Sequence, residues 1–338
     1  MIAAELDPTL PSVLPGQSAL VADIGGSNAR FGWVDPGHHA ARHVQTLPVH
    51  AHGDIAEAAH FYLDGLRRTL GADFEPPRRA ALAVATAVTG DRIEFTNSPW
   101  SFSRRALQAT LALQQLCVLN DFEALALALP HLTADQLRHH AGPAPDRHGA
   151  RAVIGPGTGL GVGGALPTPR GWMAIPGEGG HATIAPGNDE EDQILRIVRR
   201  RFEHVSAERL LSGIGLPVLH AATAELHGAP TPGDDWTAPA ILEQGLAGDA
   251  VARHTLELFC GLLGSFAGNV ALTLGARGGV YIGGGIVPRL GDFFFNSSFR
   301  ARFEAKGRLT PYVAGIPTAV IVDTLAALTG AAASLDPA

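Results

Sequence analysis

Two segments of the sequence share one local pattern, in which two short apolar runs flank a turn rich in glycine. In "LVADIGGSNARFGWVD" (residues 20–35) the turn carries Gly25 and Gly26. In "AVIGPGTGLGVGGAL" (residues 152–166) the arrangement returns in the second half of the chain. Each segment predicts a β-strand, a glycine turn and a second β-strand. Such a turn can point backbone N–H groups outward and hold a phosphate, although an ordinary hairpin has the same pattern.

The repetition predicts an internal duplication, in which two similar α/β lobes each offer one turn to a shared cleft. A length of 338 residues agrees, because one core seldom serves so long a chain. We expect a small lobe of residues 1–131 with 322–338, and a large lobe of residues 132–321. The stretch 139–150, rich in Pro, Gly and His, predicts a surface loop near the boundary.

Apolar periodicity predicts the other elements. Besides the strands of the two glycine motifs, strands are expected at residues 43–48, 80–86, 117–119 and 279–282. Helices are expected at residues 54–70, 103–116, 188–202, 206–211 and 249–275, and a last strand and helix within residues 318–335.

Charge and cysteine usage exclude several classes of protein. The net charge of −7 leaves no clustered Lys and Arg for nucleic acid or an anionic membrane. Cys117 and Cys260 are too few and too far apart for a disulfide framework or a zinc ligand set. Together these features predict a small-molecule partner and a reducing, cytoplasmic location.

No segment has the pattern of a membrane span or a secretion signal. The first 18 residues carry acids and prolines where a signal peptide needs a basic start and an apolar run, so we expect a loose leader. The apolar segments 256–274 and 318–335 are interrupted by glycines and by Asn269 or Asp323, which favours buried helices.

Two common nucleotide motifs are ruled out. A P-loop needs a Lys followed by Ser or Thr, and the single lysine, Lys306, lies in "AKGRLT". The spacing of Gly159, Gly161 and Gly164 matches a dinucleotide fingerprint, but strand-like residues follow it instead of a helix. What remains is a phosphate held by two glycine turns with Mg²⁺, and Asp23 is placed to hold the waters of that metal ion.

A second group of residues is polar and suits a polyol. It comprises Asn120 and Asp121 after a short strand, Glu178 and His181 in "PGEGGH", and Glu208 in "HVSAERLLSG". Carboxylates accept hydrogen bonds from adjacent hydroxyls, and Asp121 is the candidate to take a proton from the reacting hydroxyl. Taken singly, each residue could instead cap a helix or favour its first turn.

Together these segments resemble the bacterial glucokinases of the hexokinase and actin-like superfamily, through most of the chain. The matching segments are "DIGGSNARF" (23–31), "TGDRIEFTNSPWSFS" (89–103), "LNDFEALALALP" (119–130), "GPGTGLGVG" (155–163), "PGEGGHATIAP" (176–186), "HVSAERLLSG" (204–213) and "GGGI" (283–286). Ser27 stands where the family usually has Thr, and Thr183 stands where many members have an acid that would support His181. The related ROK family carries a cysteine-rich zinc motif that this chain lacks, so zinc of that kind is not expected.

The resemblance implies a two-lobed actin-like or ribonuclease H-like α/β fold with mixed sheets flanked by helices and the active site between the lobes. It implies ATP-dependent phosphorylation of glucose at the 6-hydroxyl, with Mg²⁺, and homodimers are common in the family. It places the 1- and 2-hydroxyls of the sugar at Glu178, His181 and Glu208. The 3-, 4- and 6-hydroxyls are placed at Asn120 and Asp121. The residues it implies for ATP are Asp23, Gly25, Gly26, Ser27, Asn28, Gly157, Thr158, Gly159, Gly283, Gly284 and Gly285.

Three other functions remain as alternatives at this point. One is a kinase for another hexose, since glucose, mannose and fructose differ at one or two positions. Another is a sugar-responsive regulatory protein that keeps the fold without turnover, although the chain has no helix-turn-helix extension or basic arm. The last is an actin-like ATPase that forms filaments, which would not need the sugar residues.

Overall fold

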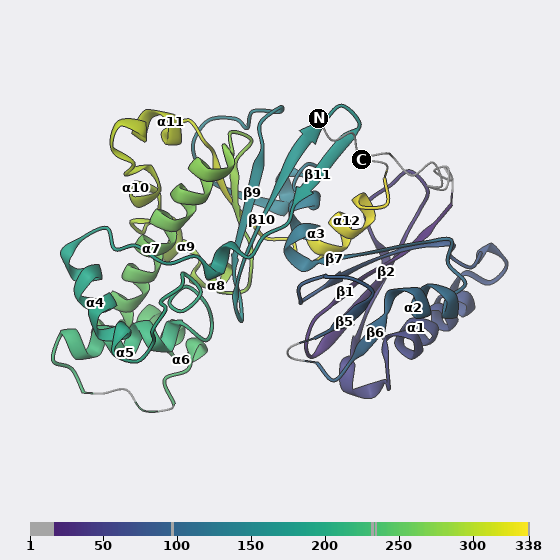
Figure 1. Ribbon diagram of the computed structural model, residues 1–338, viewed down its shortest axis with the longest axis horizontal. Helices are drawn as coiled ribbons and strands as arrows, with labels where there is room; N and C mark the ends of the chain where they lie inside the picture. Colours follow the sequence, from purple (N-terminus) through teal and green to yellow (C-terminus); the bar gives the residue numbers. More distant parts are fainter. Residues whose placement is uncertain (1–16, 96–97, 231–232, 234, 337–338) are drawn as a thin grey trace. The chain divides into compact units, whose positions relative to one another are not determined.

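The computed structural model describes residues 17–95, 98–230, 233 and 235–336. Nearly all of the expected leader, and Thr96 and Asn97 in one of the matching segments, lie outside the described residues. The chain forms two compact units (Figure 1). Unit 1 comprises residues 1–121 and 328–338, and unit 2 comprises residues 122–327.

The sheet of unit 1 has five strands in the order β3-β2-β1-β4-β7. The strands β1 (Ala19–Ile24), β2 (Asn28–Val34) and β3 (Arg42–Pro48) are antiparallel neighbours. The strands β4 (Arg79–Val84) and β7 (Gln115–Asn120) run parallel to β1. The carboxyl ends of β1, β4 and β7 therefore lie at one edge of the sheet.

Two helices bury their apolar faces in the same core as this sheet. They are α1 (Ile55–Leu70) and α2 (Arg104–Thr110), which begin at the side-chain caps Asp54 and Ser103. In that core the rings of Phe31 and Tyr62 stack with their centroids 5.6 Å apart. A small separate sheet pairs β5 (Arg92–Glu94) with β6 (Ser101–Ser103), and α12 (Ala326–Ala333) lies near the carboxyl end of the chain.

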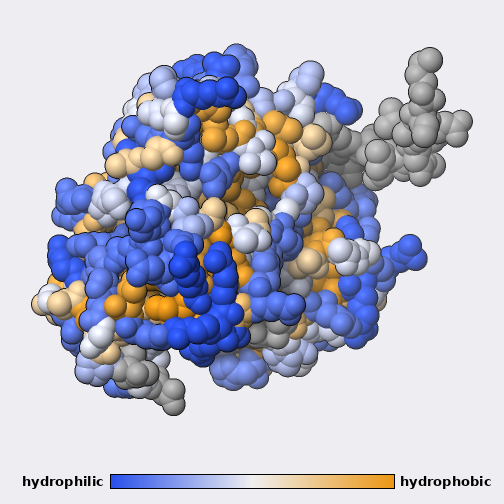
Figure 2. All heavy atoms as spheres, turned by 60° about the vertical axis from the view of Figure 1, so that its left-hand side comes forward, coloured by the Kyte–Doolittle hydropathy of each residue, from blue (hydrophilic) through white to orange (hydrophobic). Residues whose placement is uncertain are grey.

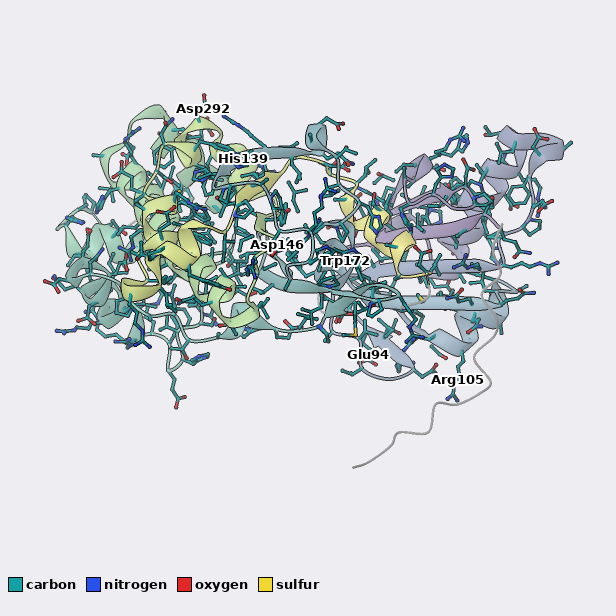
Figure 3. All side chains as sticks on the ribbon, turned by 90° about the horizontal axis from the view of Figure 1, so that it is seen from above. Glu94, Arg105, His139, Asp146, Trp172 and Asp292 are labelled. Atoms are coloured by element: carbon teal, nitrogen blue, oxygen red, sulfur yellow. The ribbon has the colours of Figure 1, made fainter. Side chains whose placement is uncertain are left out.

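The sheet of unit 2 repeats the strand order of unit 1 and adds one strand, giving β11-β10-β9-β12-β13-β8. An antiparallel trio, β9 (Arg151–Pro156), β10 (Leu160–Thr168) and β11 (Gly171–Ile175), precedes the parallel strands β12 (Val280–Ile282) and β13 (Thr318–Ile321). The shared topology confirms the duplication that the two glycine motifs predict. The Arg151 guanidinium carbon of β9 lies over the ring of Trp172 of β11, 4.9 Å from its centroid. Trp172 is labelled in Figure 3.

The long helix α7 (Ala250–Leu274) forms the core of unit 2. It contacts β9, α5 (Leu216–Leu226), α6 (Ala238–Ala247) and α10 (Phe299–Glu304), and Asp249 and Gly275 cap its ends. Among the described helices α7 alone has the length and composition to span a membrane, but 78% of its apolar window is buried within the protein. The outer residues on the side shown in Figure 2 are mainly hydrophilic, with apolar atoms between them. The burial of α7 agrees with the prediction that residues 249–275 form a core helix.

The other helices of unit 2 are shorter. Helix α4 (Asp189–Arg199) begins at the cap Asn188, and α3 (Asp121–Ala128) links the units. Four short helices lie between β12 and β13 in the chain. Three have four or five residues, namely α8 (Ile286–Leu290), α9 (Asp292–Phe295) and α11 (Thr310–Ala314), and α10 has six.

Three expectations for the fold differ from the structure. Residues 206–211 form turns, because the Ala207 and Glu208 N–H groups bond the backbone of residues 182 and 180. The expected loop 139–150 begins inside the strand β8 (Leu137–Ala141), whose Arg138 pairs with Asp292 at 2.6 Å. Figure 3 labels Asp292 and the neighbouring His139 of β8. Helix α2 also ends at Thr110, short of the predicted end at residue 116.

The boundaries between the two units also lie elsewhere than the sequence suggests. In the structure unit 1 gives way to unit 2 after residue 121 and resumes after residue 327. The predicted boundaries follow residues 131 and 321. Helix α3 accounts for the first difference. Ala126, Ala128 and Leu129 are buried in one cluster with Val153 and Tyr281 of unit 2. Apolar burial thus assigns the helix to the second sheet.

A buried ion pair ties three helices of unit 2. Glu191 of α4 is 2% exposed and accepts a 2.8 Å bond from Arg302 of α10, and Arg302 also donates to Ser265 of α7 at 3.0 Å. We expect Arg302→Met to lower the free energy of unfolding by about 3–5 kcal/mol, because it leaves a buried carboxylate unpaired. Urea denaturation followed by circular dichroism measures this change.

The control is Arg196→Met, which breaks an exposed pair with Asp192 one turn away on the same helix, at 2.6 Å. Its expected cost is below about 1 kcal/mol. Equal costs for the two variants would show that the buried pair has no special role in stability.

Candidate functional site

The first glycine turn joins β1 to β2 in unit 1. The Gly25 N–H bonds the carbonyl of Asn28 at 2.9 Å and the Ser27 carbonyl accepts from Val49 N–H at 2.9 Å, so the turn is held at both sides. Ser27 and Asn28 are exposed, and Gly25 and Gly26 are partly exposed. The turn is therefore ordered by its own backbone while its tip remains accessible to a ligand.

Asp23 lies near the end of β1, directly across from Arg30 of β2. The Arg30 Nη1 donates to Asp23 Oδ2 at 3.1 Å, and the carboxylate is 21% exposed. Burial raises the pKa of Asp23, while the charge and hydrogen bond of Arg30 oppose that rise. An anionic carboxylate with one oxygen held by Arg30 can use its other oxygen to bind the waters of a cation.

The Asn120–Asp121 pair lies at the same sheet edge as the first turn. Across the sheet, Ile24 pairs with Val84 and Val84 pairs with Asn120, so Gly25 and Asp121 both follow one row of paired residues. The Asn120 Nδ2 donates to the Thr86 carbonyl at 3.2 Å. Asp121 is the first residue of α3 and directly follows Asn120, the last residue of β7.

The second glycine turn joins β9 to β10 in unit 2 and is bonded to Glu208. The Gly157 N–H bonds the Gly159 carbonyl at 2.9 Å, and the Leu160 N–H donates to Glu208 Oε2 at 2.9 Å. A Cβ at Gly159 would lie 2.5 Å from that same oxygen. Gly159 is therefore needed so that the carboxylate can reach the turn.

Glu178 and His181 flank a short turn that packs on the same strand. The Glu208 N–H bonds the Gly180 carbonyl at 2.9 Å, and a Cβ at Gly180 would lie 2.0 Å from the Leu160 carbonyl oxygen. The His181 Nδ1 lies 3.9 Å from Glu208 Oε1. Within unit 2 the structure thus brings the predicted sugar residues His181 and Glu208 together beside the second turn.

Glu178 is exposed, and a second acid lies near it. Burial first, and then the charge of Glu178, raise the pKa of Glu123 in α3. The Thr183 hydroxyl lies 3.0 Å from His204 Nε2 instead of supporting His181. Among the described residues, the acid that faces the His181 ring within 4 Å is Glu208.

The third glycine run follows β12 and abuts the second turn. The Gly283 N–H bonds the Ile154 carbonyl at 2.8 Å, and Gly284 has φ +75° with its Cβ position 2.4 Å from the Pro156 carbonyl oxygen. The positive φ and the close approach of the Pro156 carbonyl both require glycine at position 284. Because β9 and β12 are parallel, the second turn and this run lie at the same edge of the sheet.

Sequence reasoning missed the role of Phe122. Cβ atoms at Gly155 and Gly161 would lie 2.4 and 2.0 Å from the Phe122 ring, and one at Gly163 would lie 2.5 Å from its carbonyl oxygen. Three glycines of the second motif thus accommodate the first turn of α3. Strand β10 begins directly after Gly159 and contains Gly161 and Gly164, where a dinucleotide fingerprint would begin a helix, so the fingerprint is false.

Comparison with known proteins gives one consistent result. A profile of the glucokinase family matches residues 20–338. A glucokinase from Chromobacterium violaceum is 48% identical over 330 residues, which cover 96% of this chain and 90% of that protein. A crystal structure of glucokinase from an Antarctic psychrotroph is 34% identical with a TM-score of 0.87, covering 94% of this chain and 98% of the other.

A more distant structure shares the fold. It is a ROK family glucokinase from Streptomyces griseus in complex with glucose and AMPPNP, 18% identical with a TM-score of 0.58, covering 94% of this chain and 99% of that one. The family profile over residues 20–338 and the relative of 48% identity define the class of this protein as a sugar kinase. The chain belongs to the glucokinase family.

The packing of Phe122 generates a prediction. Gly161→Ala places a methyl group inside the Phe122 ring position, so we expect a loss of about 1–3 kcal/mol in the free energy of unfolding. We also expect a lower kcat, because the displaced residue is covalently next to Asp121. Urea denaturation and steady-state kinetics measure the two effects.

Gly177→Ala is the matched control, since no atom lies within 4 Å of its added Cβ. Its unfolding free energy should stay within about 0.5 kcal/mol of the unsubstituted protein. A Gly161→Ala protein as stable as this control would refute the packing role.

Proposed function

We propose that this chain transfers the γ-phosphoryl group of ATP to the 6-hydroxyl of glucose in the cytoplasm, giving glucose 6-phosphate and ADP, with Asp121 as general base. Membership of the glucokinase family is the observation that carries the reaction. The bond that forms joins the sugar O6 to phosphorus, and the bond that breaks joins phosphorus to the bridging oxygen of ADP. The assignment of residues to each step is our inference.

Asp121 suits the role of base through its position. It begins α3 directly after β7, at the sheet edge where the first glycine turn also lies, so its carboxylate can accept the proton of a hydroxyl bound there. Asn120 is anchored to the Thr86 carbonyl and can present its remaining amide groups to a sugar hydroxyl. Packing of Phe122 against Gly155 and Gly161 fixes the first turn of the same helix.

The two glycine turns and the third glycine run are our proposal for the ATP site. Phosphates would meet the first turn (Gly25, Gly26, Ser27, Asn28) and the second (Gly157, Thr158, Gly159), and adenosine would meet Gly283, Gly284 and Gly285. The half-buried carboxylate of Asp23 fits Mg²⁺, which would neutralise charge on the transferring phosphoryl group.

The sugar ligands on unit 2 are proposed to be Glu178, His181 and Glu208. Glu208 serves two purposes in this proposal, because one of its oxygens accepts from Leu160 N–H and the other remains for a hydroxyl or for His181. Replacing Glu208 would therefore disturb the glycine turn as well as the sugar. Glu178 is exposed and is the better residue for testing recognition alone.

The first test concerns the base. In Asp121→Asn the amide keeps hydrogen bonds to glucose but cannot accept the proton, so we expect kcat to fall roughly 10²–10⁴-fold. Glucose affinity, measured by calorimetry, should stay within about tenfold. The control is Asp64→Asn, an exposed acid on α1. Turnover near that of the control would rule out Asp121 as the base.

The second test concerns the sugar. If Glu178 bonds the 2-hydroxyl, the unsubstituted enzyme should prefer glucose over mannose by at least about tenfold in kcat/KM, since an inverted hydroxyl leaves a partner unpaired. Glu178→Gln should narrow that ratio by weakening the glucose contact. Glu203→Gln, an exposed acid of unit 2, should leave the ratio unchanged. An identical ratio in both variants would contradict the assignment.

A further inference from the structure

Three side chains converge where α4 begins, α5 ends and α7 begins. They are Glu190, His227 and His254, and their ligand atoms all lie within 4.8 Å of one another. The Glu190 Oε1 lies 3.0 Å from His227 Nε2 and 2.5 Å from His254 Nε2. The two imidazole rings are 5.0 Å apart at their centroids and nearly perpendicular, with an interplanar angle of 85°.

The second nitrogen of His254 also faces an acid. Its Nδ1 lies 3.7 Å from Glu257 Oε2, and Arg253 lies 3.6 Å from the other oxygen of Glu257. A neutral imidazole carries one N–H, so a neutral His254 turns a lone pair toward one of two carboxylates. A positive charge between His254 Nε2 and Glu190 removes that conflict. Either a proton or a metal cation can supply it.

We propose that Glu190, His227 and His254 bind a divalent transition-metal ion of the Zn²⁺ class. Two imidazole nitrogens and one carboxylate oxygen are a ligand set that such ions take in proteins, with water completing the tetrahedron. At bond lengths of 2.0–2.1 Å the ligand atoms of a tetrahedral site are separated by roughly 3.3 Å. The Glu190–His227 distance is already close to this value, and the Glu190–His254 distance reaches it by a small opening of the Glu190 side chain.

Glu257 would then act from outside the ligand set. Hydrogen bonding of a ligating imidazole to a carboxylate fixes its tautomer and raises its basicity. With its proton on Nδ1 and facing Glu257, His254 presents the Nε2 lone pair to the metal. The ligands are each about one-third to one-half exposed, at 32%, 47% and 34% for Glu190, His227 and His254, so an ion can enter from solvent.

This site is separate from the proposed catalytic residues. The loop that carries Glu208 joins the end of α4 to the start of α5, whereas the metal ligands lie at the start of α4 and the end of α5. A bound ion would link α4, α5 and α7. It would lie at the start of α4 and the end of α5, which are the ends of these two helices that the Glu208 loop does not join. We therefore expect it to stabilise unit 2 without touching glucose or ATP.

The experiment uses the full-length, tag-free protein treated with EDTA and titrated with Zn²⁺ alone by calorimetry. His227→Gln and His254→Gln should each weaken one binding event by at least about tenfold, because even a lost outer contact to a ligand costs roughly that much. Zn²⁺ should also raise the apparent Tm of the unsubstituted protein, and less so in the variants.

His139→Gln is the control, an exposed histidine on β8 of the same unit (Figure 3). It should bind Zn²⁺ as the unsubstituted protein does. If His227→Gln and His254→Gln bind as much Zn²⁺, with the same affinity, as this control, the proposal is wrong. Because Zn²⁺ can also bind other carboxylates, the difference between variants is the relevant measurement.

X-ray absorption on the unsubstituted protein loaded with one equivalent of Zn²⁺ gives an answer that needs no variant to fold. Two histidine ligands are the expected result. A spectrum with oxygen ligands alone, or with a single histidine, would overturn the proposal and leave the three residues as a hydrogen-bonded cluster.

Discussion

Parallel pairing of the central strands is the constraint on which the candidate site depends. In unit 1 it puts Ile24, Val84 and Asn120 in one row, so the first glycine turn and Asp121 both begin where that row ends. In unit 2 the pairing of β9 with β12 does the same for the second turn and the third glycine run. A one-residue slip in either register would turn every following side chain to the other face of its sheet. The chemistry is thus located by backbone hydrogen bonds before any side chain is considered.

Glycine serves this arrangement in two different ways. Gly25 and Gly157 lie in partly exposed turns that their own backbone hydrogen bonds hold, and nothing lies within 4 Å of a Cβ at Gly157. Gly159, Gly161 and Gly180 are instead points of close approach for Glu208, Phe122 and a strand carbonyl. One glycine-rich motif therefore both forms a tight, partly exposed turn and leaves room for the side chains that position its neighbours.

The sequence predicted the duplicated α/β architecture well, because a strand, a glycine turn and a strand have a strong local pattern. It also placed Asp121 at the junction of β7 and α3. It could not predict that 206–211 lacks a helix, since the competing hydrogen bonds go to residues 180 and 182, far away in the chain. For the same reason the contact of Phe122 with Gly161 leaves no local signal. The Glu190, His227 and His254 cluster is likewise invisible, because its members belong to three separate helical segments.

The hydrogen bond from Leu160 N–H to Glu208 connects the two substrate sites that we propose. The same carboxylate is held by the second glycine turn through Oε2 and faces His181 through Oε1. Any movement of the turn on binding phosphate would shift Glu208, and any hydroxyl that displaces His181 from Glu208 would act on the turn. Within unit 2 alone, then, the proposed sugar and nucleotide sites share one residue. A coupling between two ligands requires a group that both can bias, and Glu208 is such a group.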